Sequence, residues 1–333
     1  REHFHNLKEL PQTEPLAPGS PLCAGCGGLT ALRLIHKVLG ENVVLVNAAG
    51  CMTLLATFPY TPLHASWLYT TMGSAAAGAQ GVRDALDILI ASGRLPAAEN
   101  LQVVVLAGDG STLDMGLSAT SAAIHRQLDF WYLCYDNEAY GNTGFQLSAA
   151  SPLGSLTATT HHGAAQRKKD IFEIWRAHRP PYVATLSAHD PIDLAEKVAR
   201  GATLRGPKLL LSLAVCPTGW GFDPSQGDEI AKLAIETGIW PLKEARDGVV
   251  RHTCRPSRFR PVEEYLRPQR RFRHLFTPQR NDELLAALQR QVDDYWREAT
   301  WWVDGGRWTV DGKGGPASNF VCRVSGWRSA IEV

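Results

Sequence analysis

Residues 108–144 read GDGSTLDMGLSATSAAIHRQLDFWYLCYDNEAYGNTG. The apolar run LQVVVLA precedes this stretch, and a second run, FWYLCY, lies inside it. Short apolar runs bounded by turn residues are typical of buried parallel strands, and ligands bind at the carboxyl ends of such strands. We therefore expect Asp109 and Asn137, which follow the two runs, to lie at one edge of a sheet.

The tripeptide GDG suits a phosphate site, although by itself it is also a common turn. Gly108 and Gly110 allow the backbone to approach phosphate oxygens closely, and Asp109 offers the hard carboxylate that Mg²⁺ prefers. Asn137 lies 28 positions after Asp109 (137 − 109), beyond the second apolar run. This spacing resembles the thiamine diphosphate motif.

The resemblance to that motif implies a set of cofactor contacts. Mg²⁺ would be held by Asp109, Asn137 and the carbonyl of Ala139. Gly110 and Ser111 would approach the diphosphate at the start of a helix.

Four of the seven cysteines occur where their thiolates can meet at one end of a sheet. CAGC places Cys23 and Cys26 three apart, whereas Cys51 and Cys216 each follow an apolar run, NVVLVNAAG and KLLLSLAV. Such thiolates bind iron–sulfur clusters or zinc, and one pair with two distant singles is less typical of a zinc ribbon. The odd count and the absence of a recognisable secretion signal disfavour disulfides.

Five motifs in this order resemble the 2-oxoacid:ferredoxin (acceptor) oxidoreductases, in particular their thiamine diphosphate-binding β subunit. The motifs are CAGCG, NAAGCM, GDGSTLDMG, DNEAYGNTG and VCPTGW, and the resemblance covers about residues 21–220. The resemblance implies one [4Fe–4S] cluster, ligated by Cys23, Cys26, Cys51 and Cys216.

The same resemblance extends to the thiamine itself. It implies that Asn142, the expected catalytic residue, lies near the reactive end of the cofactor, with Thr143 beside it. The turn formed by Gly50, Cys51 and Met52 would line the thiamine rings.

The resemblance also implies an assembly. Thiamine enzymes need a carboxylate on the aminopyrimidine, and in this family another subunit or domain supplies it. No segment of this sequence can be given that role. We therefore expect an α subunit that supplies the carboxylate, together with γ and ferredoxin-like δ subunits or their equivalents.

The implied reaction is the oxidative decarboxylation of a 2-oxo acid to acyl-CoA and CO₂, with electrons passing through the cluster to a ferredoxin-like carrier. The aromatic residues after Cys51 favour a bulky substrate such as phenylglyoxylate. Two alternatives stay open at this point. One is a non-redox thiamine-dependent decarboxylase or synthase, and the other is a non-catalytic electron-transfer subunit.

Alternating strand and helix patterns predict an α/β fold with a doubly wound parallel sheet. We expect an N-terminal arm over residues 1–20, a thiamine diphosphate and iron–sulfur domain over 21–220, and a subunit-contacting extension over 221–333. Residues 246–280 carry ten arginines, which we expect to pair with carboxylates of partner subunits. The alternative is that they contact a phosphate or coenzyme A, or dock an acidic electron carrier.

Composition limits the other classes of function. The net charge of +1 gives no indication of nucleic-acid binding. The apolar runs are too short and too often interrupted by glycine to span a bilayer. We therefore expect a cytoplasmic protein without a membrane span.

Overall fold

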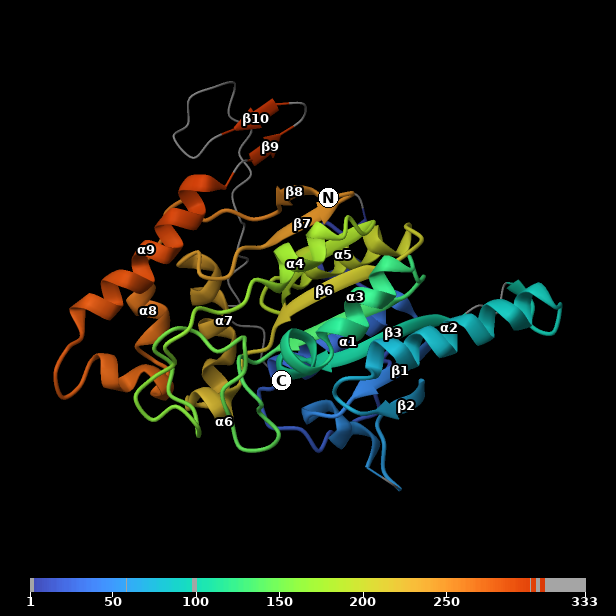
Figure 1. Ribbon diagram of the computed structural model, residues 1–333, viewed down its shortest axis with the longest axis horizontal. Coiled ribbons are helices and arrows are strands. Elements are labelled where there is room, and N and C mark those ends of the chain that lie inside the picture. Colours follow the sequence, from blue (N-terminus) through green and yellow to red (C-terminus); the bar gives the residue numbers. More distant parts are fainter. Residues whose placement is uncertain (1–2, 58, 98–100, 300, 304–305, 309–333) are drawn as a thin grey trace.

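The computed structural model describes residues 3–57, 59–97, 101–299, 301–303 and 306–308. Its centre is an eight-stranded sheet with the order β2-β1-β3-β4-β6-β5-β7-β8 (Figure 1). The first six strands run parallel, and β7 and β8 are added antiparallel. The strands are β1 (Val43–Ala48), β2 (Ser66–Thr70), β3 (Gln102–Gly108), β4 (Trp131–Asp136), β5 (Tyr182–Ser187), β6 (Lys208–Leu213), β7 (Lys243–Arg246) and β8 (Val249–His252).

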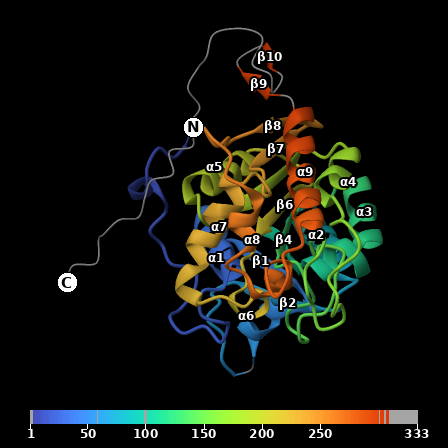
Figure 2. The same ribbon diagram turned by 90° about the vertical axis from the view of Figure 1, so that its left-hand side faces the viewer.

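Helices cover both faces of this sheet (Figures 1 and 2). A separate antiparallel pair, β9 (Trp301–Val303) and β10 (Gly306–Trp308), follows the last helix. The α-helices are α1 (Gly27–Leu39), α2 (Ala75–Ala91), α3 (Leu117–His125), α4 (Ile171–Ala177), α5 (Pro191–Ala202), α6 (Pro217–Trp220), α7 (Gly227–Glu236), α8 (Val262–Leu266) and α9 (Asp282–Glu298). Short 3₁₀ segments are η1 (Leu7–Glu9), η2 (Cys51–Ala56), η5 (Pro224–Gln226) and η6 (Arg270–Leu275), and η4 (Gly110–Met115) is a π-helix.

Alternate residues of the central strands enter two different cores. In β1, Val44 and Val46 face the core shared with α2, α3, α4 and α9, whereas Val43 and Leu45 face the core shared with α1 and α5. A strand that is buried on both faces needs a continuous apolar run, which explains why the central strands show no polar alternation. The predicted doubly wound α/β fold is confirmed.

The described part of the N-terminal arm, from residue 3 onward, contacts α1 and α5. The Glu14 carboxylate forms ion pairs with Arg33 and Lys37 of α1, at 2.5 and 3.2 Å. Near the start of the chain, the backbone N–H of Phe4 donates a hydrogen bond to Glu196 of α5 at 3.0 Å.

The residues after 220 add to the same sheet and core. β7 hydrogen-bonds to β5, and α7, α8 and α9 contribute apolar side chains to the core that includes α2. Several of the arginines expected to pair with partner subunits instead pair within the chain. These pairs are Arg260 with Glu236 and Glu264, Arg267 with Glu263, Arg271 with Glu138, and Arg280 with Glu263 and Asp282.

A helix that crosses a bilayer has to be both long and apolar. Among the helices of the described residues, none combines the length and the hydropathy that a membrane span requires.

Candidate functional site

The site lies where four neighbouring parallel strands end. In the sheet β1, β3, β4 and β6 are adjacent, so the loops at residues 49–51, 109–110, 137–144 and 214–219 meet at one edge (Figure 1). The chain crosses from β1 outward to β2 and then returns to place β3 on the other side of β1. Loops diverge at such a switch point and leave a crevice for a ligand.

Asp109 is fully buried directly after β3. Ser148 donates a hydrogen bond to its Oδ2 at 2.5 Å. Burial, and next the neighbouring carboxylate of Asp136, raise the pKa of Asp109 well above its usual range. Two buried carboxylates at one strand edge repel each other, so a bound cation would favour the ionised form of both.

Three oxygens from the two motifs converge at this point. When its amide oxygen is turned toward them, Asn137 Oδ1 lies 2.7 Å from the Ala139 carbonyl and 2.8 Å from Asp109 Oδ1. When the amide is turned the other way, Nδ2 donates hydrogen bonds to both oxygens over the same distances. Oxygens that share an octahedral Mg²⁺ are about 3 Å apart, given Mg–O distances of about 2.1 Å. The residues expected to hold Mg²⁺ therefore have a donor set and a spacing that fit this ion.

The glycine after Asp109 is needed because an aromatic ring occupies the space beside it. A Cβ at Gly110 would lie 2.3 Å from Cε1 of Tyr140. The Tyr140 hydroxyl donates a hydrogen bond to Asp114 Oδ2 at 3.1 Å, which ties the loop after β4 to η4. Ser111 is buried in the same turn, and its hydroxyl donates to the Met72 carbonyl.

The turn after β1 is also packed closely. A Cβ at Gly50 would lie 2.6 Å from the hydroxyl of Tyr135, the residue before Asp136 on β4. The backbone N–H of Gly50 donates a hydrogen bond to Thr53 Oγ1 at 3.1 Å. Met52 is buried, whereas Cys51 stays partly exposed. The predicted thiamine-lining turn thus presents its backbone and Cys51 to the crevice.

Asn142 and Thr143 are exposed on the loop after β4. The Thr143 hydroxyl donates a hydrogen bond to Gln146 Oε1 at 2.6 Å, while Gln146 Nε2 donates to the Thr143 carbonyl at 2.7 Å. Just before them, a Cβ at Gly141 would lie 3.4 Å from Cys51 Sγ. The loop that carries Asn142 therefore starts beside the turn that carries Cys51.

Three of the four cysteines expected to bind a cluster, Cys26, Cys51 and Cys216, stand at the starts of α1, η2 and α6, and Cys23 is joined to Cys26 by a backbone hydrogen bond of 3.2 Å. The backbone N–H of Gly27, directly after Cys26, donates a hydrogen bond to the Val215 carbonyl at 3.1 Å. Cys26 and Cys216 stand at the N-terminal ends of α1 and α6, and the N–H of Gly219 donates to Cys216 Sγ at 3.3 Å.

Burial raises the thiol pKa of three of these cysteines. Burial raises the pKa of Cys51 to about 12, with further contributions from Cys216, Cys26 and Cys23 in that order. Burial likewise raises the pKa of Cys26 and of Cys216. Within the described residues, no three side chains of His, Cys, Asp or Glu lie close enough to hold a metal ion.

One amide connects the two groups of predicted ligands. In the orientation that turns Oδ1 toward Asp109, Asn137 Nδ2 donates to Cys51 Sγ, and the two atoms are 3.9 Å apart. The oxygen ligands and the nearest cysteine are therefore separated by a single side chain.

Sequence reasoning missed several residues around the site. Tyr135 packs against Gly50 and Gly108 of the expected cofactor site, and Lys168 forms an ion pair with Asp136 at 2.6 Å. Trp220 donates a hydrogen bond from Nε1 to the Asn137 carbonyl at 2.9 Å. Only Tyr135, adjacent to the motif on an expected strand, and Trp220, inside VCPTGW, had a local signal.

Comparisons with known proteins agree with this geometry. Residues 48–211 match the family model for the C-terminal TPP-binding domain of thiamine pyrophosphate enzymes. Pyruvate synthase subunit PorB of Methanothermobacter thermautotrophicus is 44% identical over 296 residues, covering 87% of this chain and 99% of that protein. Ketoisovalerate oxidoreductase subunit VorB of Pyrococcus abyssi is 35% identical, with coverage of 86% and 93%.

A solved structure shows the same fold. It is the 2-oxoglutarate:ferredoxin oxidoreductase from Magnetococcus marinus with 2-oxoglutarate, coenzyme A and succinyl-CoA bound, and the TM-score is 0.52 at 21% identity. The match covers 69% of this chain and 83% of that one. By its sequence relatives and its thiamine diphosphate-binding domain, the chain belongs to the β subunits of the 2-oxoacid:ferredoxin oxidoreductase family.

Proposed function

We propose that this β subunit takes part in the oxidative decarboxylation of a 2-oxo acid, with transfer of the acyl group to coenzyme A and of electrons to a ferredoxin-like carrier. The observation that carries the proposal is the position of the Asn137 side-chain amide. One end of it lies 2.7 Å from the Ala139 carbonyl oxygen and 2.8 Å from Asp109 Oδ1, and its other end lies 3.9 Å from Cys51 Sγ. A non-redox thiamine enzyme has no use for a cysteine cluster beside its cofactor. Coenzyme A and low-potential carriers are cytoplasmic, so the proposal includes that location.

The first role of the chain is to hold the cofactor and its metal. Asp109, Asn137 and the Ala139 carbonyl would bind Mg²⁺, and the backbone at Gly108, Gly110 and Ser111 would accommodate the diphosphate. Bound thiamine diphosphate would supply the electron sink that makes decarboxylation of a 2-oxo acid feasible. The close contact between Gly110 and Tyr140 fixes the direction from which the diphosphate can approach.

The second role is to receive electrons. Cys23, Cys26, Cys51 and Cys216 would ligate a [4Fe–4S] cluster, which supplies a one-electron acceptor. Burial and mutual repulsion disfavour the thiolates of Cys26, Cys51 and Cys216 in the absence of positive charge, and cluster iron would provide that charge. Asn142, exposed on the loop beside Cys51, would contact the reactive end of the cofactor.

The activating carboxylate and the remaining subunits are proposed to come from partners. Large apolar side chains are exposed on η2, on the loop after it, on β2 and on η4, where another chain would cover them. They are Leu54, Tyr60, Leu68, Tyr69 and Met115. We assign this face to an α subunit. The γ and ferredoxin-like δ subunits, or their equivalents, would complete the complex.

For the substrate, pyruvate is the first candidate because relatives at 38–44% identity are named pyruvate synthase subunits. Two of the aromatic residues that favoured phenylglyoxylate are largely open to solvent. Tyr60 is 83% exposed and Tyr69 is 55% exposed. A partner subunit would have to close any aromatic pocket. Phenylglyoxylate and 2-oxoisovalerate are therefore further substrates to test beside pyruvate.

The test is anaerobic purification of the complex, followed by measurement of iron, acid-labile sulfide and thiamine diphosphate. We expect about four irons and one thiamine diphosphate for each chain, in addition to clusters in partner subunits. Reduction of a viologen dye that depends on 2-oxo acid and coenzyme A would then identify the substrate. Thiamine without iron would indicate a non-redox decarboxylase or synthase, and iron without thiamine an electron-transfer subunit.

Two variants divide the proposal into its parts. Cys51→Ala is expected to lower the iron content and the absorbance near 400 nm while leaving thiamine diphosphate bound. Asp109→Ala is expected to lose Mg²⁺-dependent retention of thiamine diphosphate while keeping the iron. An unchanged iron content in the first variant, or an unchanged thiamine content in the second, would reject the corresponding ligand assignment.

A further inference from the structure

Arg271 reaches the loop between Asn137 and Ala139 from a segment 133 residues away in sequence. It belongs to η6, among the arginines that follow the thiamine-binding part of the chain. Its side chain is only 1% exposed. Nε donates a hydrogen bond to Gln269 Oε1 at 2.8 Å, which fixes the orientation of the guanidinium plane. A buried and oriented arginine is costly to desolvate, so its partners decide what it does.

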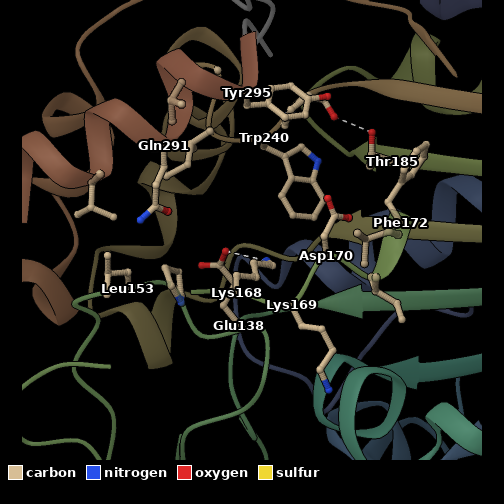
Figure 3. Close-up of a pocket in the computed structure, with 18 of the residues that line it drawn as sticks. Glu138, Leu153, Lys168, Lys169, Asp170, Phe172, Thr185, Trp240, Gln291 and Tyr295 are labelled. Atoms are coloured by element: carbon tan, nitrogen blue, oxygen red, sulfur yellow. Dashed lines mark hydrogen bonds and ion pairs between the residues drawn. The ribbon is translucent and has the colours of Figure 1, made fainter. Parts of the chain in front are cut away.

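The first contact of Arg271 is with Glu138. Nη2 donates a hydrogen bond to Glu138 Oε2 at 2.6 Å. The other oxygen of the same carboxylate accepts from Lys168 Nζ at 3.0 Å, and Lys168 also pairs with Asp136. Figure 3 shows Lys168 and Glu138 facing each other in the wall of a cavity of about 250 Å³. Two cations thus hold one glutamate in place.

The second contact is with Trp220. The guanidinium carbon lies 3.9 Å from the centroid of the Trp220 ring, within the range of a cation–π interaction. The indole Nε1 of Trp220 donates a hydrogen bond to the Asn137 carbonyl at 2.9 Å. Arg271 therefore acts on residue 138 directly and on residue 137 through the tryptophan.

The backbone between these residues needs such restraint. Glu138 has φ of +64°, a conformation that non-glycine residues adopt rarely and keep only when the surroundings enforce it. This conformation brings the Asn137 side chain and the Ala139 carbonyl, on either side of Glu138, to 2.7 Å from one another. If Glu138 adopted an ordinary negative φ, the Asn137 side-chain amide and the Ala139 carbonyl would move apart.

We propose that Arg271 is a positioning residue for the Mg²⁺ site, acting through Glu138 and Trp220 to hold the Asn137–Ala139 loop in the conformation that brings its oxygens together. The inference rests on the proposed function, because that function supplies the Mg²⁺. The way in which Arg271 positions the loop rests on the contacts described above. It also gives the arginine-rich segment a role inside the chain, because η6 then completes a site built on β3 and β4.

The test uses the complex as purified and substitutes Arg271→Met, which keeps much of the side-chain volume but removes the charge and the hydrogen bonds. Arg280→Met is the matched control, since Arg280 lies in the same region and pairs only with Glu263 and Asp282 among the described contacts. Arg271→Lys retains the charge. Glu138→Gln keeps the size of the partner and removes its charge.

Two readouts are needed. The Mg²⁺ concentration for half-maximal binding of thiamine diphosphate, followed by calorimetry or tryptophan fluorescence, should rise about 10- to 100-fold in Arg271→Met, the usual effect of removing a residue that orients metal ligands. Arg271→Lys should recover part of the loss, and Arg280→Met should match the wild type. Hydrogen exchange at residues 136–146 without ligand should become about tenfold faster in Arg271→Met.

The outcomes separate this inference from the proposed function. If the wild-type complex binds no thiamine diphosphate, the proposed function fails, and the exchange rates alone decide whether Arg271 holds the loop. Unchanged exchange and an unchanged Mg²⁺ requirement in a folded Arg271→Met complex overturn the inference. If Arg271→Met does not assemble, Arg271→Lys and Glu138→Gln are decisive, because normal Mg²⁺ affinity in both would refute it.

Discussion

At the scale of single residues, the site depends on glycines, which leave room for neighbouring aromatic side chains, as well as on its polar side chains. Gly110 makes room for the Tyr140 ring, and Gly50 makes room for the Tyr135 hydroxyl. In both places the space is taken by an aromatic residue from the strand or loop that carries Asn137. The backbone of the expected cofactor cradle and the metal loop are therefore packed directly against each other.

Gly110→Ala tests this packing. The new Cβ would lie 2.3 Å from the Tyr140 ring, and relieving the overlap is expected to cost about 1–3 kcal/mol of the free energy of unfolding. Gly81→Ala is the control, because Gly81 lies in α2 and its Cβ would meet nothing within 4 Å. The control should gain up to about 1 kcal/mol from helix propensity. Chemical denaturation of both variants measures the difference, and equal midpoints would contradict the packing argument.

The sequence predicted the site residues that directly follow strands. It missed the residues that tertiary packing brings to the site from other parts of the chain. Asp109 and Asn137 each end an apolar run, so their meeting follows from the geometry of parallel strands. Glu138, Lys168 and Arg271 meet because of tertiary packing, 30 residues separating the first two and 133 separating Glu138 from Arg271. Charged residues with no periodic pattern are normally assigned to the surface, so such a buried network has no local signature.

At the scale of secondary-structure elements, the sheet extends further than the alternating pattern predicted. β7 and β8 are short and rich in charge, with the sequences KEAR and VVRH, and they lack the apolar runs of the central strands. Glu244 of β7 is nevertheless buried, where it accepts hydrogen bonds from Tyr182 and Arg200, each at 2.6 Å. Paired charges thus replace apolar side chains in this strand, which is why hydropathy did not reveal it.

His252, at the end of β8, gives this region a dependence on pH. Burial, followed by the nearby charges of Lys243, Lys197 and Arg255, lowers the pKa of His252 to about 3. The unfolded chain takes up a proton near pH 6.5, and the folded chain does not, so stability falls as the pH drops from about 6.5 toward 3. The loss should reach about 2 kcal/mol at pH 5.

His252→Gln should flatten this part of the pH profile and retain a polar partner for the Tyr295 hydroxyl, which lies 2.7 Å from Nε2 of His252. The measurement is the unfolding midpoint in denaturant between pH 5 and 7.5. His161→Gln, at an exposed histidine on the loop before α4, is the control and should keep the wild-type slope. A wild-type slope in the His252 variant would show that other groups cause the effect.

At the scale of the whole molecule, the described residues form an α/β layer structure, and the proposed site would need a partner subunit to complete it. The crevice opens toward a face where Tyr60, Tyr69 and Met115 are more than half exposed. Among the described residues after 220, the helices α7, α8 and α9 lie together on another side of the fold (Figure 2). The open face is therefore the one through which a partner would deliver its carboxylate.

The isolated chain is accordingly expected to show no 2-oxo acid-dependent reduction of a viologen dye, even when supplied with Mg²⁺ and thiamine diphosphate. Without a carboxylate on the aminopyrimidine, the cofactor would not be activated. Adding the purified α subunit should restore the reaction. Turnover by the chain alone, at a rate comparable to that of the complex, would mean that it supplies its own activating group.

The outer strand β2 has a consequence for how cells must make this protein. It stands at the end of a parallel sheet, with Leu68 and Tyr69 exposed and one row of backbone groups facing outward. Unprotected edges of this kind template the addition of strands from other molecules, which leads to aggregation. A partner subunit that covers this edge, as proposed above, would protect the chain as well as complete its site, so recombinant production should express the subunits together from one transcript.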